Sequence, residues 1–374
     1  NAIESINLPT KILTEAKFNW SHAHSSPKLI KVHGGELGDT YWNPPPKNYD
    51  INWMIRNEDF FALRWAEPEF VRKHIQMNGP DYVGGYYLGS ECYIPAKDYI
   101  SAPGFSPGYA CERQWLYYMV WGRLLYNPNE SDDIFINACT ARYGDAGQPL
   151  FEALKAGSRM PLRLASFYNA TWDFTLYSEG FMARSANSNP ERLITVEELI
   201  KRNPLEPDYL SIREYVKMLK SGTPVPEGKI SPLQLAEQSA KDGESALSIL
   251  KTVSLSDAPK QLEAEVASAK AWAHMNLYFA EKLRAAVALQ RFRTDKDAER
   301  GKLAVQCLEK AVDQWEQLAV VTHPVFAEMP LTQIHSFRKD GPDLRVFHWK
   351  RLLPAVRAEL QRVRDETGRF GDPR

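Results

Sequence analysis

Three short segments between residues 49 and 89 decide the fold of this chain: YDINWM (Tyr49–Met54), PEFVRKHIQM (Pro68–Met77) and YVGGYYLG (Tyr82–Gly89). The first and third are runs of apolar and aromatic residues, which is typical of strands. The second has proline in its first turn and apolar residues on one side, which predicts a helix. A strand, a helix and a strand in succession form a βαβ unit, so the sequence predicts parallel strands with a right-handed crossover.

The residues before this unit are also typical of strands and loops. Glu15–His24 alternates loosely between polar and apolar residues, and a second short apolar run follows at Leu29–Val32. Three prolines, Pro44–Pro46, then force an extended connection that leads into the βαβ unit.

After Pro107 the pattern changes to that of helices. The sequence Ser231-Pro232-Leu233-Gln234 combines a capping box with proline at the first helical position, which is a strong helix start. The predicted helices are Glu112–Tyr126, Asp132–Tyr143, Gln148–Phe167, Ser211–Lys220, Ser231–Val253, Pro259–Phe292, Asp295–Val321 and Phe347–Asp365. Because short connections join most of them, this half of the chain predicts an α-helical bundle.

The predicted fold class is α/β plus all-α. A closed eight-stranded barrel needs about 250 residues, so residues 1–110 are too few to form one alone. Two or three strands would also leave apolar edges open. We therefore expect residues 1–110 to be the last βα units of a (β/α)8 (TIM) barrel whose earlier units, a missing N-terminal barrel segment, are not in this chain. Residues 111–374 are expected to form a mainly α-helical C-terminal domain.

Composition excludes several classes of partner and chemistry. The 374 residues include 46 basic and 47 acidic ones, a formal net charge of −1, so nucleic acid is not expected as a partner. No stretch approaches the roughly 20 apolar residues that span a bilayer, so no membrane partner is expected. Cys92, Cys111, Cys139 and Cys307 stand far apart, which predicts free, buried thiols. No dinucleotide-binding, phosphate-loop or nucleophile-elbow motif occurs, and we expect no cofactor.

The first residues bear on where the protein works. The chain opens with Asn1-Ala2 and not with Met. We expect either a removed signal peptide or a longer N-terminal region, and an exported protein in the periplasm or outside the cell. The sequence leaves the oligomeric state open.

Acidic residues follow two of the predicted strands. Glu58 and Asp59 come after the first strand of the βαβ unit, and Glu91 comes after the second. In a parallel barrel the active site lies at the carboxyl ends of the strands, so these acids are expected to face one cleft. Paired carboxylates cleave glycosides: one protonates the leaving oxygen, and the other activates water or attacks the anomeric carbon. The alternative is that Glu58 or Asp59 caps a helix or pairs with Arg56 or Arg64.

Aromatic residues surround both acidic positions, and their rings can stack on the apolar faces of sugars. The candidates for this substrate-binding role are Trp53, Trp65, Tyr87 and Tyr93. Arg56 is the expected partner of a uronic-acid carboxylate, because a guanidinium meets a carboxylate with two parallel hydrogen bonds. The alternative for Arg56 is a salt bridge to a neighbouring acid.

A pair of histidines stands nearby. His22 and His24 are two residues apart, so on a strand both side chains would point to the same face. They are candidates for hydrogen bonds to a carbohydrate hydroxyl. A metal is the alternative, with His33, Glu36 or Asp39 as the third ligand. Because this spacing matches no zinc signature, we expect polar residues that line a pocket and no metal site.

One loop of the helical half, Trp172–Glu179, also carries aromatic and acidic residues. Its aromatic side chains are expected to pack in the core. The alternative is that the loop reaches over the cleft that carries the acids.

Several strings in the sequence carry a resemblance to a known family. They are Arg56–Trp65, Gly84–Glu91, Trp115–Leu124 with Tyr126-Asn127-Pro128, and Phe347–Pro354. In this order they resemble the end of the barrel and the helical tail of xylan α-glucuronidases and their relatives in polysaccharide-degrading bacteria. The resemblance implies a glycoside hydrolase with a barrel catalytic domain and a C-terminal helical domain. It also implies inverting hydrolysis, an acid and a base on separate strands, and a basic pocket for the uronate.

The hypothesis from sequence is therefore part of an O-glycosidase that cleaves plant or algal polysaccharide-derived glycosides, with an oligosaccharide or polysaccharide as its partner. Three alternatives stay open. The first is a non-catalytic carbohydrate-binding or scaffolding module that retains the fold. The second is a helical protein-interaction module built on residues 231–365. The third is a metal-dependent hydrolase or lyase that uses His22 and His24.

Overall fold

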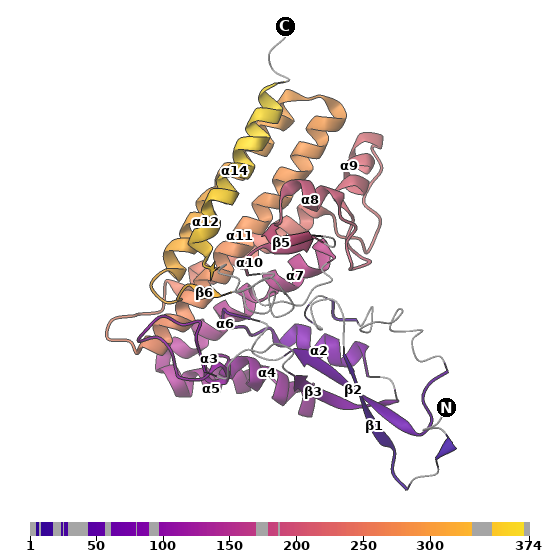
Figure 1. Cartoon of the computed structure of the whole chain (residues 1–374), viewed down its shortest axis with the longest axis vertical. Coiled ribbons are helices and arrows are strands. Elements are labelled where there is room, and N and C mark those ends of the chain that lie inside the picture. Colours follow the sequence, from indigo (N-terminus) through magenta and orange to yellow (C-terminus); the bar gives the residue numbers. More distant parts are fainter. Residues whose placement is uncertain are drawn as a thin grey trace.

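The computed structural model describes residues 5–6, 9–17, 24, 26–28, 44–56, 61–79, 81–89, 97–169, 179–185, 188–330 and 346–369. Figure 1 shows a small sheet near the N-terminus and a larger helical assembly, in which α11 (Lys260–Asp295), α12 (Ala298–Thr322) and α14 (Trp349–Gly368) form long, neighbouring rods. The chain therefore has an α/β part followed by a helical part, as its sequence predicted.

The strands of the N-terminal part form one parallel sheet. They are β1 (Ile12–Lys17), β2 (Tyr49–Arg56) and β3 (Val83–Gly89), in the spatial order β1-β2-β3. The register pairs Lys17 with Met54, and Arg56 with Gly89, so the three strands end close to one level. The parallel βαβ unit that the sequence predicted is confirmed. The described strands form a small open sheet and not a closed barrel.

The helix α2 (Pro68–Met77) lies between β2 and β3 in the chain, with the bounds that the sequence predicted. The Glu67 side chain caps it by accepting a hydrogen bond from the backbone N–H of Phe70, and Pro68 occupies the first turn, where its missing N–H costs nothing. Phe70, Val71 and His74 lie on its buried face. Asn78 follows the last turn and donates to the His74 carbonyl (2.7 Å).

The remaining elements belong to the helical part. The helices are α3 (Ala110–Arg113), α4 (Trp115–Tyr126), α5 (Asp133–Tyr143), η3 (Gly144–Ala146), α6 (Gly147–Gly157), α7 (Arg159–Tyr168), α8 (Val196–Lys201), α9 (Ile212–Ser221) and α10 (Pro232–Leu250), besides α11, α12 and α14. Two antiparallel pairs complete the list, β4 (Met182–Ser185) with β5 (Ser188–Leu193) and β6 (Met329–Pro330) with β7 (Val346–Phe347). The sequence predicted neither strand pair nor α8.

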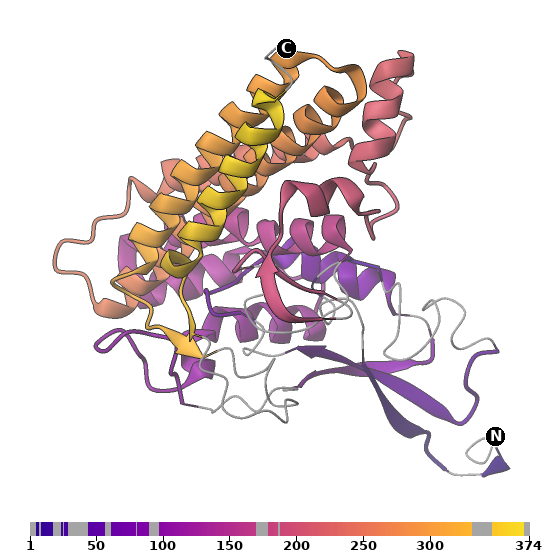
Figure 2. The ribbon, with the colours of Figure 1, turned by 45° about the horizontal axis from the view of Figure 1, so that its top comes forward.

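The long helix α11 is the centre of this part. It contacts α10 and α12 along its length and also packs on α6, α8 and α9. Figure 2 shows α14 lying along the orange α11–α12 pair. Because neighbours surround α11, apolar residues occupy most of its circumference, from Trp272 to Phe279 and Leu283. Its aromatic and methionine residues Trp272, Met275 and Phe279 are fully buried.

One predicted helix is two helices in the structure. The expected helix from Gln148 to Phe167 is broken at Ser158, between α6 and α7. Gly157 lies so close to Trp272 of α11 that a Cβ at this position would come within 2.7 Å of the Trp272 Cβ. The Ser158 hydroxyl accepts from the backbone N–H of Ala66 (2.9 Å), and its carbonyl accepts from the Trp65 indole N–H (3.0 Å). The break therefore arises from packing against distant residues, which helical periodicity does not encode.

One hydrophobic core joins the sheet to the helices and continues across residue 110. Its largest buried side chains include Trp53, Trp65, Trp121, Trp272, Trp315 and Trp349. Cys139 and Cys307 are free and buried in it, as predicted, whereas Cys111 is free but exposed.

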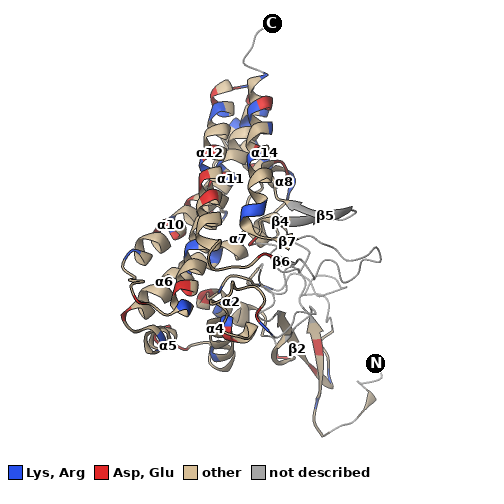
Figure 3. Ribbon diagram, turned by 60° about the vertical axis from the view of Figure 1, so that its left-hand side comes forward, with Lys and Arg blue, Asp and Glu red and all other residues tan. Residues whose placement is uncertain are grey.

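The surface of the helical part carries both signs of charge. Figure 3 shows Lys and Arg interspersed with Asp and Glu along α11, α12 and α14. Exposed ion pairs such as Arg357–Glu316 and Arg364–Glu309 join α14 to α12. Among the helices that the structure describes, none has the length and apolar character needed to span a membrane.

Candidate functional site

Because β1, β2 and β3 run in the same direction, their carboxyl ends meet at one edge of the sheet, which we call the carboxyl edge. The predicted acids follow β2 and β3 in the sequence, directly after this edge. Glu58, Asp59, Glu91, His22 and Tyr93 lie outside the described residues, as does the side chain of Arg56. The structure describes the side chains of His24, Trp53, Trp65 and Tyr87 and the segments that follow the loops after β2 and β3.

The described aromatic candidates lie in the interior or in the sheet. Trp53 is buried and donates from its indole N–H to the Asn78 carbonyl (3.2 Å), and Trp65 is buried against the ring of Phe61 (5.5 Å between centroids). Neither indole presents a face to solvent, so both rings pack the core here. Tyr87 is half-buried in β3, opposite Met54 of β2.

His24 is buried as well, inside a cluster of aromatic rings. Phe61, Trp65 and Trp121 lie 5.3, 5.5 and 5.7 Å from it, centroid to centroid. The Tyr117 hydroxyl lies 3.5 Å from its Nε2. His24 is therefore part of the aromatic core between the sheet and α4.

The segment that follows the predicted acids Glu58 and Asp59 is residues 61–66, which we call the anchor segment. It has no regular secondary structure and is fully buried apart from minor exposure at Arg64, so its backbone groups need partners inside the protein. Gln114 supplies two of them, donating to the carbonyls of Phe61 (2.9 Å) and Leu63 (2.7 Å).

Glu179 supplies two more partners to the anchor segment. Its carboxylate accepts from the backbone N–H groups of Ala62 (2.9 Å) and Leu63 (2.5 Å), and Glu179 itself is fully buried. The Glu179 carbonyl in turn accepts from the indole N–H of Trp349 (2.8 Å). Glu179 therefore links the anchor segment to the start of α14.

Arg113 joins the segments that follow two of the loops. Its guanidinium donates to the carbonyls of Phe61 (3.0 Å) and Ala62 in the anchor segment. Its Nε lies 3.3 Å from Oδ1 of Asp98, which stands seven residues after the predicted acid Glu91. One buried cation thus fixes the chain that follows Glu58 and Asp59 against the chain that follows Glu91.

Asp98 and Arg113 each stabilise the charged form of the other. Burial alone would raise the pKa of the Asp98 carboxyl, but the Arg113 guanidinium and the backbone N–H groups of Ile100 and Ser101 outweigh burial and hold that pKa below its ordinary value. Burial lowers the pKa of Arg113, and Asp98 opposes this change. Asp98 is therefore ionised at neutral pH.

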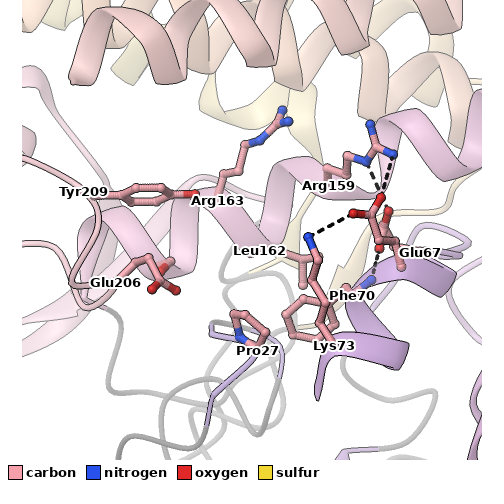
Figure 4. A pocket seen from close by; sticks show the side chains of 11 residues that line it. Pro27, Glu67, Phe70, Lys73, Arg159, Leu162, Arg163, Glu206 and Tyr209 are labelled. Atoms are coloured by element: carbon pink, nitrogen blue, oxygen red, sulfur yellow. Dashed lines mark hydrogen bonds and ion pairs between the residues drawn. The ribbon is translucent and has the colours of Figure 1, made fainter. Parts of the chain in front are cut away.

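A pocket of about 330 Å³ lies beside α2, between that helix, α7 and the chain around Tyr209 (Figure 4). Its walls come from separate parts of the sequence: Pro27, Glu67, Glu69, Phe70, Lys73, Arg159, Leu162, Arg163, Ser166, Glu206 and Tyr209. Figure 4 shows Glu206 and Tyr209 on one side and the linked Glu67 and Arg159 on the other. This volume is at the lower end of the range for small-molecule sites.

Two carboxyl groups of the pocket have perturbed proton affinity. Burial raises the pKa of Glu67, although the Phe70 N–H and Arg159 partly offset it. Burial likewise raises the pKa of Glu206, whose described hydrogen-bond partner is the Ser26 hydroxyl (3.2 Å). Burial also raises the pKa of Tyr209 to about 12. Perturbed groups in a pocket mark it as a second candidate site.

The sequence pointed to none of these pocket residues. Glu67 stands directly before a helix that begins with proline, so its capping role could have been read from the pattern. Arg163, Glu206 and Tyr209 carry no motif, and only the packing of α7 against the chain near residue 206 brings them together. Within the described ranges there is no cluster of three or more His, Cys, Asp or Glu that could hold a metal, and His22, His33, Glu36 and Asp39 lie outside those ranges.

Comparison with known proteins adds evidence on the fold. No family model matches this chain, and no curated protein matches its sequence. Among solved structures, it is similar to a GH138 enzyme targeting pectin rhamnogalacturonan II, with a TM-score of 0.67 and 15% sequence identity. The match covers 86% of this chain and 48% of the other, so this chain spans about half the length of that neighbour. The likeness supports a glycoside hydrolase-like fold, and not the xylan α-glucuronidase family specifically.

Proposed function

We propose that this chain is part of a glycoside hydrolase that acts on a plant or algal polysaccharide and uses paired carboxylates at the carboxyl edge. The similarity of its fold to a GH138 enzyme that targets a pectin polysaccharide supports this class of reaction. Pectin is the substrate class to test first, because the neighbouring enzyme targets pectin.

The observation that carries the proposal is the register between β2 and β3. Arg56 and Gly89 are paired at the carboxyl edge as the last residues of neighbouring strands. Glu58 and Asp59 follow Arg56 by two and three residues, and Glu91 follows Gly89 by two. Both acidic sequences therefore leave the sheet from adjacent positions, from which two carboxylates can converge on one glycosidic bond.

The proposal includes a larger barrel. Within the described residues neither the outer edge of β1 nor that of β3 is paired. Leu13 of β1 is 59% exposed. An exposed apolar side chain on an unpaired edge strand favours pairing with another strand. We infer that β1–β3 are an arc of a (β/α)8 barrel, completed by strands from outside this sequence.

The proposed mechanism assigns one proton donor and one base or nucleophile. Of Glu58, Asp59 and Glu91, one carboxyl group protonates the leaving oxygen, and one on the neighbouring strand activates water or attacks the anomeric carbon. In the uronate-specific version, which the sequence resemblance implies, Arg56 binds the sugar carboxylate through two parallel hydrogen bonds. Arg113 and Glu179 contribute by holding the chain after these acids in one geometry.

The test is substitution of the predicted acids in the intact gene product. For Glu58→Gln and Glu91→Gln we expect the rate of sugar release to fall by about 10²- to 10⁴-fold, because an amide neither donates a proton as an acid nor accepts one as a base. Sugar release from pectin and xylan fractions is measured by chromatography. The matched control is Glu227→Gln, an exposed residue of the helical part.

The result also separates the alternatives. Unchanged turnover in both variants would remove Glu58 and Glu91 from catalysis. Binding of the polysaccharide without any turnover in the wild-type protein would favour the non-catalytic carbohydrate-binding module. Circular dichroism of each variant checks that the loss of rate is not a loss of fold.

A further inference from the structure

The pocket beside α2 contains polar groups that the protein itself does not use. The Ser166 hydroxyl and Nη1 of Arg163 are buried and have no hydrogen-bond partner among the described residues. The half-buried Tyr209 also lines the pocket, and its ring packs on Phe167. Buried polar groups are normally paired, so a donor set of this kind indicates a ligand or ordered water.

The charges that line the pocket are close to balanced. Arg159 binds Glu67 (3.1 Å) and reaches Glu69 (3.7 Å), and Lys73 binds Glu69 (2.9 Å). Nη2 of Arg163 binds Asp242 of α10 (2.7 Å). These pairs use most of the positive charge internally, so the pocket offers no surplus for an anion.

One carboxyl group of the pocket has few partners among the described residues. Glu206 accepts from the Ser26 hydroxyl, and no basic side chain forms a salt bridge with it within the described residues. A group of this kind repels an anionic ligand and accepts hydrogen bonds from hydroxyls. Pro27, Phe70 and Leu162 supply apolar surface to the same pocket (Figure 4). Hydroxyl donors, a carboxyl acceptor and an apolar wall together match the polar rim and apolar face of a sugar ring.

We propose that this pocket binds one neutral sugar unit of a glycan, as a binding site additional to the cleavage site at the carboxyl edge. That the ligand is a glycan rests on the proposed function; that it is uncharged rests on the pocket. Tyr209 and Ser166 donate to ring hydroxyls, and Glu206 accepts from them. The pocket holds a neutral sugar of the polysaccharide, either a branch or a neighbouring unit. The acids at the carboxyl edge cleave another unit, which is acidic or neutral.

The test compares neutral and acidic sugars by titration calorimetry and saturation-transfer NMR on the intact protein. The probes are methyl α-L-rhamnoside, D-galactose and D-galacturonate. We expect at least one neutral probe to bind more tightly than galacturonate. Tyr209→Phe and Glu206→Gln should each raise its Kd by about three- to tenfold, the usual loss for one hydrogen bond. Tyr209→Phe keeps the ring that packs on Phe167, so it is expected to fold.

Matched controls are Tyr126→Phe, whose side chain is 88% exposed on α4, and Glu227→Gln. Neither should change the Kd. Tighter binding of galacturonate, or an unchanged Kd in both pocket variants, would overturn the assignment.

The proposal for the pocket and the proposal for the cleavage site can be refuted independently. Glu91→Gln should lower turnover by about 10²- to 10⁴-fold and leave the Kd of the neutral probe unchanged if both proposals hold. Full turnover in Glu58→Gln and Glu91→Gln, together with pocket-dependent sugar binding, would refute the cleavage site alone. If turnover falls as expected in Glu58→Gln and Glu91→Gln, but Tyr209→Phe and Glu206→Gln leave the Kd of the neutral probe unchanged, the pocket proposal alone is refuted.

Discussion

At the scale of single residues, buried charges determine where the loops of the carboxyl edge are held. Arg113 is 1% exposed and contacts both the anchor segment and Asp98. Glu179 accepts hydrogen bonds from two backbone N–H groups of the same segment. Of these three, the sequence drew attention only to Glu179, as part of a loop with two alternative roles. The structure shows it buried and in contact with the segment after Glu58 and Asp59.

The Asp98–Arg113 pair gives a prediction for acid stability. Because the folded-state pKa of Asp98 is lowered, its contribution is complete above the unfolded-state value of about 4 and is lost as pH falls through the folded-state value. Asp98→Asn should lower the free energy of unfolding by roughly 1.5–3 kcal/mol at pH 7, the range for hydrogen bonds to a charged group. The difference from wild type should shrink at pH 3, measured by urea denaturation at pH 7, 4 and 3.

The control for this pair is Asp50→Asn. Asp50 forms an exposed ion pair with Lys11, so its loss should cost no more than about 1 kcal/mol. A difference between Asp98→Asn and wild type that is the same at pH 7 and pH 3 would contradict the linkage.

At the scale of elements, helix ends were readable from the sequence and helix contacts were not. Ser231 accepts from the Gln234 N–H, and the Gln234 side chain accepts from the Ser231 N–H, as the capping box predicted. By contrast, the end of α6 depends on how closely Gly157 approaches α11. The capping signal is local, whereas the approach of two helices is a property of the pair.

Gly243 tests this distinction. Alanine in the middle of α10 should favour the helix by about 1 kcal/mol. A Cβ at Gly243, however, would lie 2.7 Å from the Ala273 carbonyl and 3.0 Å from Leu277 of α11, and overpacking of this kind costs about 1–3 kcal/mol. Since the overlap involves backbone, we expect Gly243→Ala to lower the midpoint of urea denaturation.

The matched control is Gly122→Ala in α4, where nothing lies within 4 Å of the new Cβ. This variant should be as stable as wild type or more stable by up to about 1 kcal/mol. If Gly243→Ala were stabilised to the same extent, close packing of α10 on α11 would not limit stability.

At the scale of the whole molecule, a second buried ion pair holds the helical part together. Lys282 of α11 and Glu359 of α14 are both buried and directly bonded. Lys282 also donates to the Ile194 carbonyl (2.9 Å), and Glu359 accepts from the Val196 N–H at the start of α8 (2.5 Å). The pair therefore joins three helices that are far apart in the sequence.

Removing one partner of this pair should cost more than removing both charges. Lys282→Met leaves the Glu359 carboxylate buried without its cation, which is expected to lower the free energy of unfolding by about 3–5 kcal/mol. Lys282→Met with Glu359→Gln should be less destabilised, because the amide is neutral and still accepts from Val196. Urea denaturation of both variants measures the difference.

The control for this pair is Arg357→Met, which removes an exposed ion pair with Glu316 and should change stability by no more than about 1 kcal/mol. A double variant as unstable as Lys282→Met alone would show that the uncompensated charge is not the cause.

What the sequence determined by itself is the order and type of the main elements. Periodicity, proline position and capping are local, and they predicted β2, α2 and β3 and the long helices α10, α11 and α12 because those elements meet local rules. The acids Glu58, Asp59 and Glu91 were also assigned by local logic, from their positions after strands. They stay predictions.

The tertiary structure alone decided which residues meet. It placed Trp53, Trp65 and His24 in the interior, joined Arg113 to Asp98 and to the anchor segment, and collected the pocket that contains Glu206. None of these contacts follows from spacing along the chain. They result from burying apolar area between elements that are distant in sequence, and every charge buried with that area then required a partner.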